Sequence, residues 1–293
     1  MSFYVHHVNV FASTPDGGSP TPVVADASSM SDAEMQAVAK QNGHECVFVL
    51  PPKADSGCDL HLRFWVPNQE MNMCGHATVG AVWLLHKLEL LAQKSLRIAT
   101  KSGIVEAAVS RENGTITVEI SQPCGTVEVV PNSFHAAICD VLGITGKDLL
   151  DLPFQNAGTS RVKTLVPLKS VALLDGLQPD FSRMKSLCED LDCTGLYPYA
   201  IEDEKAAIFH ARQFPKSSGF PEDPATGIAA TALLFGLRAI GLVDANEGSI
   251  TVYQGRAMGC ASKISARLRK GEDGKVQGCW FGGSVQMDNK HHP

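Results

Sequence analysis

The chain has 293 residues, 44% hydrophobic and 19% charged, a balance that excludes a disordered protein and allows two domains, each with its own core. The net charge is −6 and no basic cluster occurs, so we expect no nucleic-acid partner. No apolar run has bilayer-spanning length and no signal peptide is recognised, so we expect a cytoplasmic protein without a membrane partner. The nine cysteines include no Cys-x-x-Cys pair, which is typical of reduced thiols rather than of disulfides or a zinc site.

The first half of the chain reads as many strands around one apolar helix. We predict strands at 8–11 and 23–25, followed by a helix that begins at the capping box Ser31-Asp32-Ala33-Glu34 and ends at Gly43. Further strands, the last two joined by an Asn-Gly hairpin turn, are predicted at 44–50, 60–66, 95–100, 104–109 and 115–120.

A turn carrying several chemical groups precedes the first central helix, which is expected near 75–88. In the stretch Cys74-Gly75-His76-Ala77-Thr78, a thiol, an imidazole and a hydroxyl lie within one turn of the helix start. Unpaired backbone N–H groups and the helix dipole favour an anion at such a position. The alternative is an ordinary strand-to-helix turn, in which Thr78 caps the helix and His76 is satisfied in the core.

Residues 123–131 are predicted to cross into the second half. We therefore expect one domain at 1–127 and a second at 128–293, with a last strand near 280–288 that can cross back to the first domain. Helices are predicted at 133–142, 181–191 and 224–240, the last being the second central helix. Strands are predicted at 163–168, 172–174, 197–201, 207–214 and 249–253, whereas 155–160 is interpreted as a connection and 289–293 as a disordered polar tail.

The turn before the second central helix, Glu222-Asp223-Pro224-Ala225-Thr226-Gly227, indicates an internal repeat. At an offset of 149 residues (223 − 74), Cys74 aligns with Asp223, and two His-x-Arg triplets and two Leu-Leu pairs align as well. The offset is close to half of the chain, so we interpret the pattern as an ancient duplication. Two such turns can face each other across a cleft and direct both helix N-termini at one small anion.

Glu45 directly precedes the apolar segment 46–50 and allows two interpretations. It is either a surface residue at the end of a strand, or a carboxylate whose pKa is raised by apolar neighbours to suit general acid–base work. The local sequence leaves both open.

Several segments together resemble the phenazine-biosynthesis PhzF-like isomerase family: Glu45, 74–78, 222–227, Gln254-Gly255 with Met258-Gly259, and 281–284. They occur in the family's order over nearly the whole chain. The resemblance implies an α+β fold of the diaminopimelate epimerase kind, in which two pseudo-symmetric domains each wrap a barrel-like mixed sheet around a central helix, with the active site between them. It also implies an isomerase without cofactor or metal, often a homodimer, that acts on a small carboxylic acid.

The resemblance also suggests catalytic roles. Glu45 matches the family's general acid–base, which carries a proton between carbons, while His76 and Asp223 match groups that position the substrate and assist proton transfer. In wider relatives, such as the proline racemases and diaminopimelate epimerase, cysteines occupy both turns and act from opposite faces of the substrate. Only Cys74 remains as a thiol here.

The substrate-binding residues implied by the resemblance lie in the same two turns. Gly75 and Gly227 match glycines whose N–H groups hold a carboxylate, and Thr78 and Thr226 are expected to contribute to binding. Ile228 stands where the family has a small polar residue, so a hydroxyl is missing. The family's Gly-Asn-Pro reads 18–20 Gly-Ser-Pro here, and its Gly-Arg-Pro-Ser reads 259–262 Gly-Cys-Ala-Ser, which indicates a substrate other than that of the phenazine enzyme.

Three functions follow from these residues. The first is an isomerase in which Glu45 carries the proton, the second is an epimerase, racemase or dehydratase that works through Cys74, and the third is a non-catalytic binding protein on the same fold. Nucleotide-binding motifs and histidines at metal-ligand spacing do not occur in the sequence.

Overall fold

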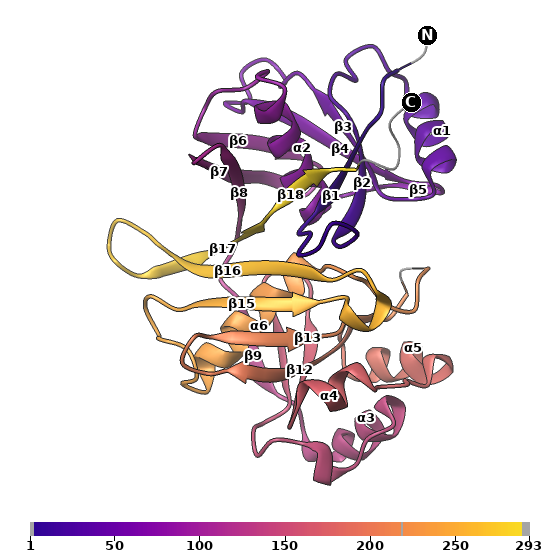
Figure 1. Ribbon diagram of the computed structural model, residues 1–293, viewed down its shortest axis with the longest axis vertical. Helices are drawn as coiled ribbons and strands as arrows, with labels where there is room; N and C mark the ends of the chain where they lie inside the picture. Colours follow the sequence, from indigo (N-terminus) through magenta and orange to yellow (C-terminus); the bar gives the residue numbers. More distant parts are fainter. Residues whose placement is uncertain (1–2, 218, 289–293) are drawn as a thin grey trace. The chain divides into compact units, whose positions relative to one another are not determined.

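The computed structural model describes residues 3–217 and 219–288 (Figure 1), so the predicted tail at 289–293 lies outside the described residues. The chain forms two compact units. Unit 1 comprises Met1–Ser121 and Gly282–Pro293, and unit 2 comprises Gln122–Phe281. The division after Ser121 falls six residues (127 − 121) before the predicted boundary at 127/128.

The described residues of unit 1 form a mixed sheet with two helices. The helices are α1 (Asp32–Asn42) and α2 (Gly75–Lys87). The strands are β1 (His6–Val10), β2 (Ser19–Val24), β3 (Cys46–Leu50), β4 (Leu60–Val66), β5 (Gln69–Met71), β6 (Ser95–Thr100), β7 (Gly103–Glu112), β8 (Thr115–Gln122) and β18 (Val285–Met287). Along the sheet, β18–β1 and β1–β2 pair antiparallel, β2–β3 parallel, β3–β4 antiparallel, β4–β6 parallel, and β6–β7 and β7–β8 antiparallel.

The predicted capping box at the start of α1 is confirmed. The Ser31 hydroxyl accepts a hydrogen bond from the Glu34 N–H, and the Glu34 carboxylate accepts one from the Ser31 N–H. Gly43 ends the helix in the left-handed region at φ 68°. Local sequence signals therefore fix both ends of α1, which packs on β3 and β4.

The described residues of unit 2 form four α-helices and the remaining strands. The helices are α3 (His135–Leu142), α4 (Val171–Asp175), α5 (Phe181–Asp190) and α6 (Gly227–Ala239). The strands are β9 (Thr126–Val129), β10 (Gln155–Gly158), β11 (Lys163–Leu168), β12 (Gly195–Asp203), β13 (Ile208–Ala211), β14 (Phe214–Pro215), β15 (Ser249–Gln254), β16 (Ser262–Lys270) and β17 (Val276–Gly283).

The strand pairings of unit 2 repeat those of unit 1. Strands β9–β10 and β10–β11 pair antiparallel, and β11–β12 pair parallel. Next, β12–β13 pair antiparallel, β13–β15 parallel and β15–β16 antiparallel. The series from β18 through β1, β2, β3, β4 and β6 to β7 has the same order of orientations. Two units built on one topology agree with the duplication predicted from the sequence.

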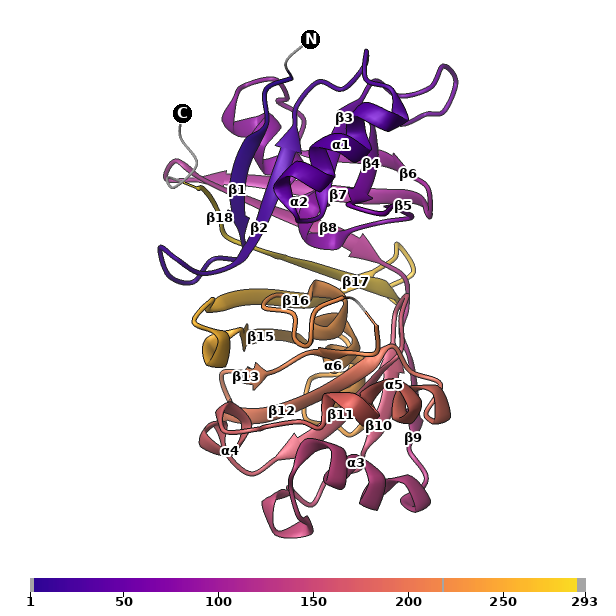
Figure 2. The ribbon, with the colours of Figure 1, turned by 90° about the vertical axis from the view of Figure 1, so that its right-hand side faces the viewer.

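One apolar helix packs inside each unit, as Figure 1 shows for α2 and Figure 2 for α6. The α2 helix contacts β1, β2 and β3, and α6 contacts β10, β11 and β16. Glycines permit the close approach, since a Cβ on Gly80 would lie 2.9 Å from Val10 Cγ2 and one on Gly236 would lie 2.4 Å from Leu165 Cδ1. The second large core of unit 2 lies where α3, α4 and α5 cover β11 and β12.

Two predictions in unit 2 are wrong. The expected strand at 172–174 is the short helix α4, because the Ser170 hydroxyl caps its first turn by accepting the Leu173 N–H at 3.2 Å. The expected connection at 155–160 contains β10, which gains its order by pairing with β9 and β11, two partners that a local reading does not reveal. Among the described residues, no helix has both the length and the apolarity required to cross a membrane.

Candidate active site

The Cys74 turn brings four predicted residues of unit 1 together at the start of α2. Cys74 is the N-cap residue, is 6% exposed, and its Sγ lies 3.5 Å from His76 Nδ1 and 3.6 Å from Nε2. Thr78 is buried and donates its hydroxyl to the Cys74 carbonyl at 2.8 Å, so it tightens the first turn rather than capping it. Thiol and imidazole are thus adjacent beside the N–H groups of the first helical turn, which begins at Gly75.

An arginine on the central strand of unit 1 fixes the segment that leads to this turn. Arg63 in β4 donates to Glu70 Oε1 in β5 and to Asp32 Oδ1 in α1, both at 2.7 Å. The Arg63 hydrogen bond lowers the pKa of Glu70 and so keeps the pair charged. The Arg63–Glu70 pair therefore holds β5 in position, and the segment that leads to Cys74 begins from this strand.

Glu45 immediately precedes β3 and is partly buried. Within the described residues, no hydrogen bond or ion pair engages its carboxylate. Burial, and secondarily the charge of Glu45, raises the pKa of the neighbouring Cys46 to about 12. Cys46 is therefore an inert core thiol, and Glu45 is the ionisable group at this position.

The Asp223 turn brings four predicted residues of unit 2 together at the start of α6. Asp223 Oδ2 accepts the Thr226 hydroxyl at 2.5 Å, and Oδ1 accepts the Ala225 N–H at 3.3 Å. Gly227 opens the helix and is buried, while Ile228 is partly buried. A Cβ on Gly227 would lie 2.0 Å from Phe281 Cε2, so only glycine fits there.

A glutamine that the sequence analysis mentioned only as part of a motif holds the Asp223 turn. Gln254 Nε2 donates to the Asp223 carbonyl at 2.6 Å and to Thr226 Oγ1 at 3.1 Å. Its Oε1 accepts the Thr226 N–H at 3.4 Å and the Tyr197 hydroxyl at 3.1 Å. Tyr197 was missed altogether, because nothing in the local sequence of β12 connects it to a turn that lies 26 residues (223 − 197) further along the chain.

A buried ion pair anchors the residue before Asp223. Arg212 donates to both Glu222 carboxylate oxygens, at 2.9 and 2.7 Å, and both side chains are 9% exposed. The same guanidinium donates to the carbonyls of Leu174, Asp175 and Leu177 at the end of α4. The aligned arginines of the two His-x-Arg triplets therefore have equivalent partners, since each forms an ion pair with a glutamate in the segment that leads to a central helix.

The residue offset between the two copies of the repeat is smaller at the strands than at the central helices. Arg63 and Arg212 are equivalent at the predicted offset of 149, but the helices begin at Gly75 and Gly227, 152 residues apart (227 − 75). The N-cap residues are therefore Cys74 and Thr226, and Asp223 precedes its helix by three more residues. The expected equivalence of Cys74 with Asp223 is wrong at the level of the helix start, because the second turn is longer.

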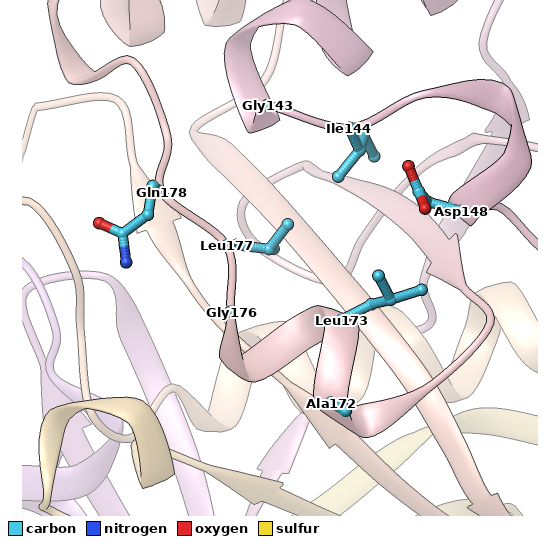
Figure 3. Close-up of a pocket in the computed structure, with 8 residues that line it drawn as sticks. All are labelled: Gly143, Ile144, Asp148, Ala172, Leu173, Gly176, Leu177 and Gln178. Atoms are coloured by element: carbon cyan, nitrogen blue, oxygen red, sulfur yellow. The ribbon is translucent and has the colours of Figure 1, made fainter.

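A pocket away from both turns lies beside the first residues of α4 and the end of α3 (Figure 3). It has a volume of about 370 Å³ and one ionisable lining residue, Asp148. The Asp148 carboxylate accepts hydrogen bonds from the N–H and the hydroxyl of Thr145. Its lining includes none of the predicted site residues. Among the described residues, no group of three or more His, Cys, Asp or Glu side chains is placed to hold a metal.

Comparisons with known proteins agree with this architecture. The family model described as "Phenazine biosynthesis-like protein" matches residues 8–284. The chain is 31% identical to the uncharacterized isomerase YddE of Escherichia coli strain K12, over 94% of each chain, and 29% identical to the uncharacterized isomerase YfhB of Bacillus subtilis, over 89% of this chain and 88% of that one.

Similarity to solved structures identifies the fold. A PhzF-family phenazine biosynthesis protein of Bacillus anthracis superposes with a TM-score of 0.87 at 26% identity, over 98% of this chain and 97% of the other. A probable proline racemase of Agrobacterium radiobacter matches with a TM-score of 0.61 at 12% identity, covering 98% and 91%, which is a likeness of fold alone. The fold is thus the predicted epimerase-like α+β fold, and the chain belongs to the phenazine biosynthesis-like (PhzC-PhzF) family, whose curated relatives are named as isomerases.

Proposed function

We propose that this protein is a cofactor-independent isomerase that moves a proton between two carbons of a small unsaturated carboxylic acid. The observation that carries the proposal is the partly buried Glu45 carboxylate, which no described residue engages, in a unit whose central helix begins at the Cys74–His76 pair. Glu45 takes a proton from one carbon and returns it to another, so the pair of electrons released from the C–H bond moves through the allylic system.

The developing negative charge on the substrate needs donors that are already oriented. Gly75 and Gly227 each begin a central helix, where backbone N–H groups lack intrahelical acceptors and the helix dipole is positive. We assign the substrate carboxylate to backbone N–H groups of this kind. Fixed dipoles of this kind stabilise a carbanion without reorganisation.

The remaining residues of the two turns take supporting roles in this proposal. His76 and Asp223 orient the substrate and exchange protons with its polar groups, while the Thr226 hydroxyl holds the Asp223 carboxylate at 2.5 Å. Ile228 presents an aliphatic side chain where relatives have a small polar one, which favours a substrate with an apolar edge at that point. We also propose that the enzyme is a cytoplasmic homodimer, which its molar mass in solution by light scattering tests.

A second candidate is an epimerase, racemase or dehydratase that works through Cys74. The contact of 3.5 Å between Cys74 Sγ and the His76 ring favours it, because an imidazole beside a thiol can accept its proton and leave a thiolate base. A carboxylate at Asp223 in place of a second thiol makes the acid and the base chemically unlike, which suits a reaction with unlike substrate and product, such as a dehydration, better than a racemisation.

The experiment that separates these candidates is deuterium incorporation from heavy water into a panel of small carboxylic acids, followed by NMR. Loss of incorporation in Glu45→Gln together with retention in Cys74→Ala supports the isomerase. The reverse pattern supports the thiol-dependent reaction. Absence of incorporation in the wild-type protein over the whole panel contradicts both and leaves a binding protein.

A further inference from the structure

Two of the polar side chains buried in unit 2 lie near Asp223 and have polar ends that no described hydrogen bond pairs. Lys163, the first residue of β11, is 4% exposed, and Gln213 is 1% exposed. Among the described residues, neither Gln213 Nε2 nor Gln213 Oε1 has a hydrogen-bond partner, and no described residue bonds to the Lys163 ammonium. Groups of this kind cost folding free energy when they are buried unpaired, so each calls for a specific reason, such as a catalytic role or a bound partner.

The sheet places both side chains on one face, close to Asp223. The parallel register that pairs Thr164 with Leu196 puts Lys163 beside Gly195 on β12. A Cβ built on Gly195 would lie 2.4 Å from Gln213 Nε2, so the glutamine amide occupies the space above Gly195 on the face from which the Lys163 side chain also projects.

Asp223 lies next to this pair. Its N–H donates to the Gln213 carbonyl at 3.1 Å, and the two residues form an isolated β-bridge. Burial lowers the pKa of Lys163 to about 8, and the negative charge of Asp223 opposes this shift, so ammonium and carboxylate are within electrostatic range of each other. Arg161 and the thiols of Cys193 and Cys188 are the other groups in range.

The hydrogen-bonding capacity of the pair defines what it accepts. An ammonium offers three donors and a primary amide offers two more, against one carbonyl acceptor. A donor-rich, cationic pair of this kind matches the oxygens of a carboxylate. We propose that Lys163 and Gln213 form a second carboxylate subsite beside Asp223, so that the substrate is a small unsaturated dicarboxylic acid. This inference rests on the proposed function only where it identifies the bound dicarboxylic acid as the substrate.

The test compares two acids that differ in one carboxylate, glutaconate and pent-2-enoate, by calorimetric titration of the intact protein. We expect the wild-type protein to bind glutaconate at least about tenfold more tightly, and the Lys163→Met and Gln213→Leu variants to lose this preference. Lys169→Met is the matched control, because Lys169 follows the other end of β11, is exposed and donates to the Lys147 carbonyl, and it keeps the preference.

Two further readouts distinguish a failure of the subsite proposal from misfolding of a variant and from a failure of the proposed activity. The Lys163 side-chain NMR signal, assigned by its absence in Lys163→Met or by selective labelling, is expected to shift in the wild-type protein on addition of glutaconate, even if a variant fails to fold. Equal affinity of the wild-type protein for the two acids, or an unshifted Lys163 signal, overturns the subsite. Deuterium incorporation into the whole panel of small carboxylic acids tests the proposed function by itself, so either inference can fail without the other.

Discussion

Replacing Glu222 by glutamine tests whether the buried ion pair holds the Asp223 turn. The substitution keeps the size of the side chain but removes its charge and one of the two oxygens that accept from Arg212. The guanidinium stays buried, with its three carbonyl acceptors at the end of α4 intact. The perturbation is therefore confined to one side of the arginine.

The size of the effect follows from burial. Both partners are 9% exposed, and removing one member of a buried pair costs about 3–5 kcal/mol; because glutamine keeps one acceptor, we expect about 3 kcal/mol for Glu222→Gln. The matched control is Glu247→Gln, which breaks the surface pair of Glu247 with Lys270, in which the glutamate is 82% exposed. A pair of that kind contributes less than about 1 kcal/mol.

Equilibrium urea unfolding gives the loss of stability, and hydrogen–deuterium exchange read by mass spectrometry locates it. In Glu222→Gln we expect faster exchange in peptides covering 171–177 and 213–230, with lower catalytic activity because Asp223 follows the altered residue directly. The control is expected to exchange like the wild-type protein. Identical unfolding and exchange in Glu222→Gln and Glu247→Gln would refute the assignment of the ion pair as the anchor of this turn.

Three further substitutions have defined outcomes. Gly227→Ala places a Cβ 2.0 Å from Phe281 Cε2 and is expected to cost about 1–3 kcal/mol in urea unfolding, whereas Gly146→Ala meets nothing within 4 Å and serves as its control. Burial lowers the pKa of Lys163 from its ordinary 10.5 to about 8, so its charge opposes folding below pH 8 and this penalty fades as the pH rises to 10.5. The difference in stability between the wild-type protein and Lys163→Met is expected to narrow by about 3 kcal/mol over that range, and a constant difference contradicts the burial argument. Ser31→Ala removes the capping box and is expected to destabilise α1 by about 1 kcal/mol in hydrogen exchange, an effect that unchanged protection would disprove.

The parts of the fold that sequence predicted well are those with local signals. The helix α1 has its capping box and its terminal glycine in the adjacent sequence, and β4 is a strand from Leu60 to Val66 as predicted. The two errors have different causes. Residues 172–174 lie in α4, whose local N-cap at Ser170 the prediction overlooked. The strand β10 exists because two strands distant in the sequence flank it.

The candidate site shows the same division. Both turns were visible in the sequence because their chemical groups are consecutive. The length of the second turn was not visible, since an ungapped offset cannot register that Asp223 lies three residues before the N-cap Thr226. Tyr197 and Lys163 were missed for another reason: each is one residue of an apolar strand, and only the folded sheet brings it near Asp223.

The central claim is that one carboxylate, Glu45, carries the proton from donor to acceptor carbon. The most direct measurement takes the acid that the wild-type protein exchanges fastest, deuterates its donor carbon, and follows a single turnover in ordinary water by NMR. One carrier predicts that part of the label reappears at the acceptor carbon and that Glu45→Gln abolishes turnover. Complete loss of the label to water, with turnover that survives in Glu45→Gln but not in Cys74→Ala, would contradict the account.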